Sequence, residues 1–139
     1  MSSSSLPQRA LRKLAAAWLV GQLLVLLTLA QILVALVPFR SYARWLRSPV
    51  AGPDAPPALV RSLRRKLPLA ARLLPWRPQC LPQALAGRYV LARRGYGSRL
   101  SLGVADDHRE LSAHAWLTSG GLFVCGRSEQ ARFSEVAAF

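Results

Sequence analysis

Two side chains of this sequence, Cys80 and His114, could form a nucleophile and base pair for covalent catalysis. Cys80 follows the helix-breaking segment Pro75–Pro78 and lies where a helix is predicted to begin. Free N–H groups and the positive end of a helix dipole favour a thiolate at such a position. His114 comes 34 residues later, within the alternating pattern of a strand. The Cys80 amide is placed to contribute to an oxyanion hole.

The other cysteine and histidine have simpler interpretations. Cys125 ends the apolar run Leu122–Cys125 and is expected to be a buried hydrophobe. His108 follows two aspartates in a predicted solvated turn. Read by themselves, Cys80 and His114 also fit a buried thiol and a partly buried sheet histidine. A Cys80–Cys125 disulfide fits the count, but no secreted framework accompanies it, so two free thiols are expected. Cys80, His108, His114 and Cys125 lack the pairs of ligands close in sequence that a structural zinc motif has, so we predict no metal site. We also predict no cofactor.

The elements that must position the pair are helices followed by strands, which predicts an α+β fold. After a Pro-rich linker at 48–57, helical spacing and proline breaks predict helices over 58–74, with a kink at Pro68, and over 81–94, followed by Gly95. Alternation then predicts an antiparallel meander of strands at 99–104, 111–118, 122–125 and 132–139, with a turn at 106–108 and Gly120-Gly121 as a hairpin.

The N-terminal part of the chain has a different character. A polar, Ser-rich leader at 1–8 precedes Leu14–Phe39, which is apolar on all sides of a helix, long enough to span a bilayer, and ended by Pro38. A membrane helix and a helix packed on the domain both remain open. Flanking arginines place the C-terminal domain in the cytoplasm, with attachment to the inner face of the cell membrane as an alternative. The predicted division is 1–47, linker 48–57, and domain 58–139.

The charge balance points to an anionic partner. Nineteen Lys and Arg oppose six Asp and Glu, a net charge of +13, and seventeen of the nineteen are arginine. Lipid headgroups, an acidic peptide and nucleic acid all fit this charge. The basic residues are spread among aliphatic ones without any nucleic-acid-binding motif, which argues against nucleic acid.

Five segments together resemble the leader peptidase of lasso-peptide biosynthesis: CLPQALA, LARRGY, LSLGV, AHAWL and ARFSEVAAF. This family is the stand-alone, transglutaminase-like B protein, related to the C-terminal domain of the microcin J25-processing protein. The resemblance implies a papain/transglutaminase-like cysteine peptidase, with Cys80 as nucleophile and His114 as general base and acid. It also implies a precursor peptide as substrate, a leader-recognition protein acting in trans, and an ATP-dependent lasso cyclase.

The family's third catalytic residue is an aspartate downstream of the histidine, and here the expected stretch 120–126 holds no carboxylate. Several replacements remain open: Glu129, Asp106 or Asp107 from a turn, Ser119, a backbone carbonyl, or a Cys80–His114 dyad. Two other functions also stay open. One is a catalytically silent transglutaminase-like scaffold, and the other is a basic, membrane-associated interaction protein.

Overall fold

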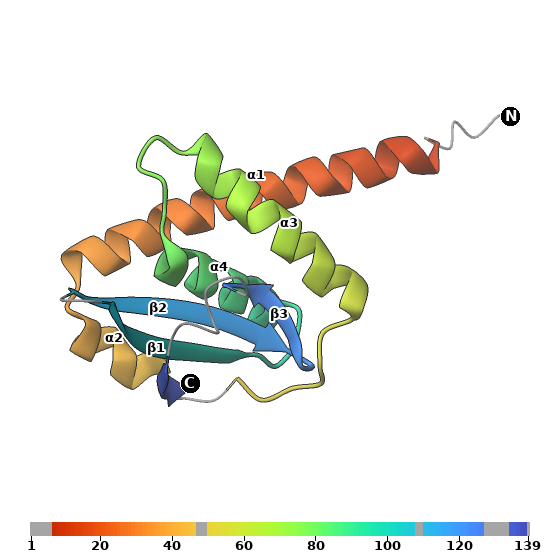
Figure 1. Ribbon diagram of the computed structural model, residues 1–139. Coiled ribbons are helices and arrows are strands. Elements are labelled where there is room, and N and C mark those ends of the chain that lie inside the picture. The colour runs from red at the N-terminus through yellow and green to blue at the C-terminus, as the bar shows by residue number, and fades with distance from the viewer. Residues whose placement is uncertain (1–6, 47–49, 108–109, 127–133, 139) are drawn as a thin grey trace, which may run out of the picture.

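A computed structural model describes residues 7–46, 50–107, 110–126 and 134–138, with the backbone alone at 39, 44–46, 104–107, 110–113 and 134–138. Within these residues, helices come first and strands follow, as predicted for an α+β fold. Helices α1, α3 and α4 lie on one side of the sheet, and α2 lies below β1 in the view of Figure 1. The elements are α1 Gln8–Leu36, α2 Phe39–Leu46, α3 Pro57–Leu73, α4 Cys80–Arg93, β1 Arg99–Asp107, β2 Glu110–Ser119, β3 Leu122–Cys125 and β4 Ser134–Ala138.

Local patterns located most of these elements. The helices predicted at 58–74 and 81–94 are α3 and α4, displaced by one residue, and α3 continues past Pro68 to Leu73. We predicted a turn at 106–108, but Asp106 and Asp107 belong to β1, so this part of the prediction is wrong. His108 lies outside the described residues. Helix α2 was not predicted. It follows Pro38 closely, and its arginines were interpreted only as the basic flank of the apolar segment.

The strands form one antiparallel sheet in the order β3-β2-β1-β4, so the predicted meander is wrong for the last strand. Strand β4 pairs with β1, not with β3; Val104 lies opposite Ser134. The physical reason is edge length, since nine-residue β1 has a long edge to be paired and β3 has only four residues. The hairpin between β2 and β3 is confirmed, because Gly120 and Gly121 have φ of +59° and +75°.

Helices α3 and α4 pack closely on the sheet, and this packing positions the N-terminus of α4. Gly87 of α4 is buried so tightly that an added Cβ would lie 2.9 Å from Leu117 Cδ2 and 3.2 Å from Leu67 Cδ1. Arg64 Nε on α3 also donates a hydrogen bond of 2.7 Å to the Phe123 carbonyl on β3. These contacts connect two helices and two strands, so they hold the N-terminus of α4 in a fixed position relative to β2.

Helix α1 packs on this domain along one stripe. Leu19, Leu23 and Leu27 are buried and belong to the same core cluster as residues of α3, α4 and the sheet. The rest of the helix is far less covered: in its most apolar 18 residues, 22 % are buried. By length and composition, α1 is the one helix in the described residues that could cross a membrane. One side of α1 is therefore part of the protein core.

Candidate active site

The first residue of α4 is Cys80. Gln79 has extended backbone angles as the N-cap, and Pro82 lies in the first turn, where its missing N–H costs nothing. The side chain of Gln83 donates a hydrogen bond of 3.0 Å back to the Pro78 carbonyl, which closes the entry into the helix. N–H groups of a first helical turn have no partner within the helix. Half-buried Cys80 therefore lies beside N–H groups that can stabilise a negatively charged substrate oxygen.

The Cys80 sulfur contacts the edge of β2. The Ala115 N–H donates to Cys80 Sγ over 3.4 Å. In antiparallel sheets the N–H and C=O of one residue point to the same edge. A Cβ added to Gly126, the residue after β3, would be 2.9 Å from the Ala115 oxygen. The sulfur therefore occupies the edge of β2 where β3 ends, against the peptide unit that joins His114 to Ala115.

The His114 ring is held by a backbone carbonyl. Its Nε2 lies 3.3 Å from the Gly126 oxygen. Because a carbonyl only accepts, Nε2 carries the proton in this contact. The ring also stacks with Trp116, with centroids 6.3 Å apart and planes at 27°. Among the orienting groups left open by the sequence, a backbone carbonyl therefore does contact the ring.

The hydroxyl of Ser119 serves another purpose. It accepts a hydrogen bond of 3.1 Å from the Ala55 N–H and donates one of 2.8 Å to the Gly97 carbonyl. These contacts attach the linker before α3 to the start of β1. Ser119 is also an odd number of residues from His114 on β2, so the two side chains point to opposite faces of the sheet. Ser119 is not the group that orients the ring.

Asp106 and Asp107, two candidates for orienting the His114 ring, lie farther along β1 than the residue that pairs with His114. His114 pairs with Gly103, and Asp106 and Asp107 follow three and four residues later, roughly 10 and 13 Å along the strand. The backbone register brings another acid nearer: Glu135 pairs with Gly103 from the other side, so it is two strands, or roughly 10 Å, from His114. Sequence reasoning missed this position, because the expected meander placed the last strand beside β3. Glu129 lies outside the described residues.

The second cysteine is a buried neutral thiol, as predicted. Burial is the main reason that the pKa of Cys125 is raised to about 12; a backbone hydrogen bond at Leu117 lowers this pKa, and the charge of Cys80 makes a smaller contribution that raises it. Both cysteines are free thiols. Within the described part of the chain, no group of three or more His, Cys, Asp or Glu residues could hold a metal ion.

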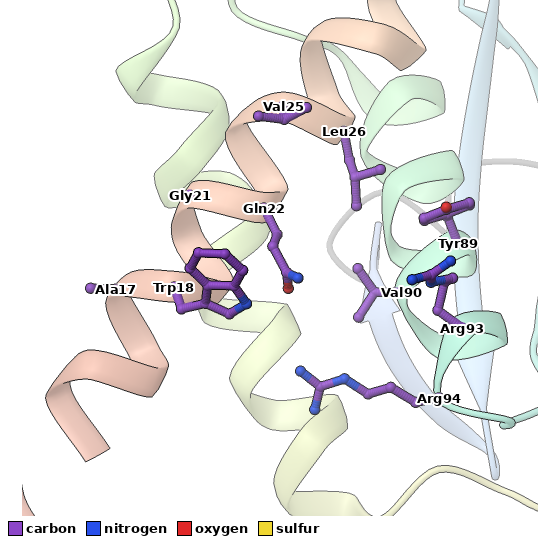
Figure 2. Close-up of a pocket in the computed structure, with 10 residues that line it drawn as sticks. All are labelled: Ala17, Trp18, Gly21, Gln22, Val25, Leu26, Tyr89, Val90, Arg93 and Arg94. Atoms are coloured by element: carbon purple, nitrogen blue, oxygen red, sulfur yellow. The ribbon is translucent and has the colours of Figure 1, made fainter. Parts of the chain in front are cut away.

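A groove of about 660 Å³ lies elsewhere, between α1 and the C-terminal half of α4 (Figure 2). Trp18 and Gln22 line it from α1, and Tyr89, Arg93 and Arg94 from the end of α4. Cys80 begins the same helix, roughly 14 Å from Tyr89 and roughly 20 Å from Arg93 at 1.5 Å per residue. The groove is therefore separate from the thiol and imidazole.

Comparison with known families identifies the fold. A model of the transglutaminase-like superfamily matches residues 23–138, from within α1 to the end of β4, and the match includes Cys80 and His114. No curated protein and no solved structure matches the chain. The superfamily includes cysteine peptidases and transferases. With its cysteine at the start of a helix and its histidine on the adjoining strand, the chain belongs to the transglutaminase-like superfamily.

Proposed function

We propose that this chain is a cysteine peptidase that removes the leader from a ribosomally made lasso-peptide precursor. One observation carries the proposal: Cys80, at the N-terminus of α4, has its sulfur 3.4 Å from the nitrogen of the peptide unit that follows His114. The packing of α4 on β2 thus supports the proposal, because the Cys80 sulfur lies against the backbone that follows His114. The sequence motifs around both residues support leader removal as the particular reaction.

The reaction divides between the two side chains. The imidazole of His114 takes the thiol proton, and the Cys80 sulfur attacks the carbonyl carbon of the bond between leader and core. The resulting oxyanion is stabilised by N–H groups at the start of α4, including that of Cys80. His114 then protonates the departing amine as the C–N bond breaks and an acyl-enzyme remains. Finally His114 deprotonates a water molecule, which attacks the acyl carbon and releases the leader carboxylate and the free thiol.

A second candidate function has support in the sequence. The stretch 120–126, where the resembling family has its aspartate, holds no carboxylate. This favours a transglutaminase-like scaffold that binds a precursor without cutting it.

The proposal also names partners. A leader-recognition protein presents the precursor in trans, and an ATP-dependent cyclase closes the ring on the released core peptide. The basic surface of the chain, with a net charge of +13, suits an acidic stretch of the precursor or of the recognition protein.

The test is cleavage of the precursor by the full chain in the presence of the recognition protein, followed by mass spectrometry. Cys80→Ala and His114→Ala are each expected to lose cleavage by at least about a hundredfold. Cys125→Ser is the matched control, because it removes the other thiol and should leave cleavage largely intact. Persistent cleavage by Cys80→Ala refutes the assignment, and an inactive wild-type chain that still binds precursor supports the scaffold.

A further inference from the structure

Helix α1 has a second apolar stripe, and this one is exposed. Its members are large side chains at spacings of three, four or seven residues, and Trp18 is 71 % exposed. Counted at 100° per residue, they fall within about 60° of one another around the helix, well away from the stripe that contacts the core. The stripe consists of Leu11, Leu14, Trp18, Val25, Leu29, Ile32 and Leu36.

The dimensions of this exposed stripe limit what can cover it. From Leu11 to Leu36 it is roughly 38 Å long at 1.5 Å per residue. No small ligand is that long, and soluble monomers rarely expose a continuous apolar surface of this kind. In Figure 1 the N-terminal end of α1 extends away from the other helices and the sheet. The covering partner must therefore be an extended apolar surface.

The charge of the helices indicates the sign of that partner. The segments α1, α2, α3 and α4 contain no Asp or Glu and twelve Lys or Arg residues. All six acids of the chain lie at position 54 or between positions 106 and 135. The first turns of α1 carry exposed Arg9, Arg12 and Lys13 on the side opposite the apolar stripe. An anionic surface complements these helices, whereas a second copy of the chain would bring like charges together.

The groove beside the exposed stripe is also lined by apolar and aromatic side chains next to arginines. Trp18 and Val25 belong to the stripe and also line the groove, whose other wall includes Tyr89 at 47 % exposure. Figure 2 shows Arg94 reaching from the end of α4 toward α1, with Arg93 beside Tyr89. Exposed aromatic rings next to arginines are the side chains favoured at the headgroup level of a bilayer, where the rings lie among acyl chains and the guanidinium groups bind phosphates.

We propose that α1 lies parallel to an anionic membrane surface, with the exposed stripe among the acyl chains and Arg93 and Arg94 on lipid phosphates. The helix does not span the bilayer, because its opposite stripe of Leu19, Leu23 and Leu27 is part of the protein core. A spanning helix would have to carry α3 and α4 into the hydrocarbon or leave that core. This attachment is independent of the proposed peptidase activity, and the surface is separate from Cys80.

The test uses the full chain and flotation with vesicles of equal parts phosphatidylglycerol and phosphatidylcholine, compared with vesicles of phosphatidylcholine alone. We expect binding to the anionic vesicles, weakened by added salt. Arg93→Gln with Arg94→Gln should lower the partition coefficient about tenfold or more, since each arginine near an anionic surface contributes about fivefold. Trp18→Gln with Val25→Gln should lower it about tenfold. All four residues are exposed, so circular dichroism should show an unchanged fold.

Matched controls come from exposed residues on α3. Arg61→Gln with Arg65→Gln removes the same charge, and Leu73→Gln removes an apolar side chain that is 61 % exposed. Equal losses from these controls, or equal binding to both kinds of vesicle, would overturn the proposal. So would a stable dimer in sedimentation equilibrium that the stripe variants dissociate, or capture of an acidic protein that the stripe variants abolish while no vesicle binds. An N-terminal tag protected from protease inside the vesicles would show a spanning helix and would also overturn it.

Discussion

At the scale of single residues, the Gly126 carbonyl contacts the His114 ring, and we predict that it positions the ring. Gly126 has a φ of +85°, and an added Cβ would lie 2.6 Å from Trp116 Cβ and 2.9 Å from the Ala115 oxygen. Gly126→Ala must therefore move the end of β3 and its carbonyl. We expect kcat for precursor cleavage to fall about tenfold to a hundredfold, since displacements near 1 Å have this effect.

The control for this prediction is Gly121→Ala. Gly121 has a similar φ of +75°, but its added Cβ would meet nothing within 4 Å. Both variants therefore carry the strain of a left-handed alanine, about 1–2 kcal/mol, and only one disturbs the carbonyl. Equal kcat values for the two variants, measured at matched folded fractions, would mean that the Gly126 carbonyl does not position the ring.

The buried thiol of Cys125 should make the stability of the fold depend on alkaline pH. Burial raises the pKa of Cys125 from an ordinary 9.0 to about 12. Below pH 9 this thiol is neutral in both the folded and the unfolded chain. Between pH 9 and 12 only the unfolded chain releases its proton, so the unfolded state binds fewer protons and the free energy of unfolding falls as pH rises. Urea titrations should show a steeper alkaline fall for the wild type than for Cys125→Ala, and identical slopes would contradict the assignment.

At the scale of elements, two helical glycines make a matched pair. Gly87 lies in α4 against Leu67 and Leu117, whereas a Cβ added to Gly21 in α1 would meet nothing within 4 Å. Gly87→Val should lower the free energy of unfolding by about 1–3 kcal/mol through overpacking between helices and sheet. Gly21→Ala should raise it by about 0.5–1 kcal/mol through helix propensity. Thermal or urea unfolding measures both, and a stabilising Gly87→Val would show that α4 is not packed so closely.

The elements that the sequence predicts correctly are those whose causes lie within a short stretch of the chain. Proline breaks and spacing located α3 and α4, and the paired glycines located the β2–β3 hairpin. Cys80 and His114 were singled out because each belongs to a local pattern. The partners of β4 and the carbonyl of Gly126 depend on contacts between distant segments and on a backbone group that every residue has. No residue type in the sequence indicates a strand partner or a particular backbone carbonyl. For this reason the positions of Glu135 and Gly126 near His114 were not predicted.

At the scale of the whole molecule, α1 is both a core element and an exposed surface. Three of its leucines, Leu19, Leu23 and Leu27, are buried with the cores of α3, α4 and the sheet. Burial of each leucine is worth about 2–5 kcal/mol when its loss leaves a cavity. The total for three is comparable with the 5–15 kcal/mol that stabilises a typical domain. The predicted domain at 58–139 is therefore expected to depend on the helix for its stability.

Two truncations test this dependence. A chain that begins at residue 37 lacks the buried stripe, and we expect it to show no cooperative unfolding transition in calorimetry. A chain that begins at residue 15 loses Leu11 and Leu14, which are exposed, and should keep its melting temperature within a few degrees. The shorter cut also removes Arg9, Arg12 and Lys13, so it should still weaken vesicle binding while leaving the fold intact. If the chain from residue 37 melts cooperatively at the temperature of the full protein, α1 is dispensable for the fold, and its apolar residues serve the membrane surface alone.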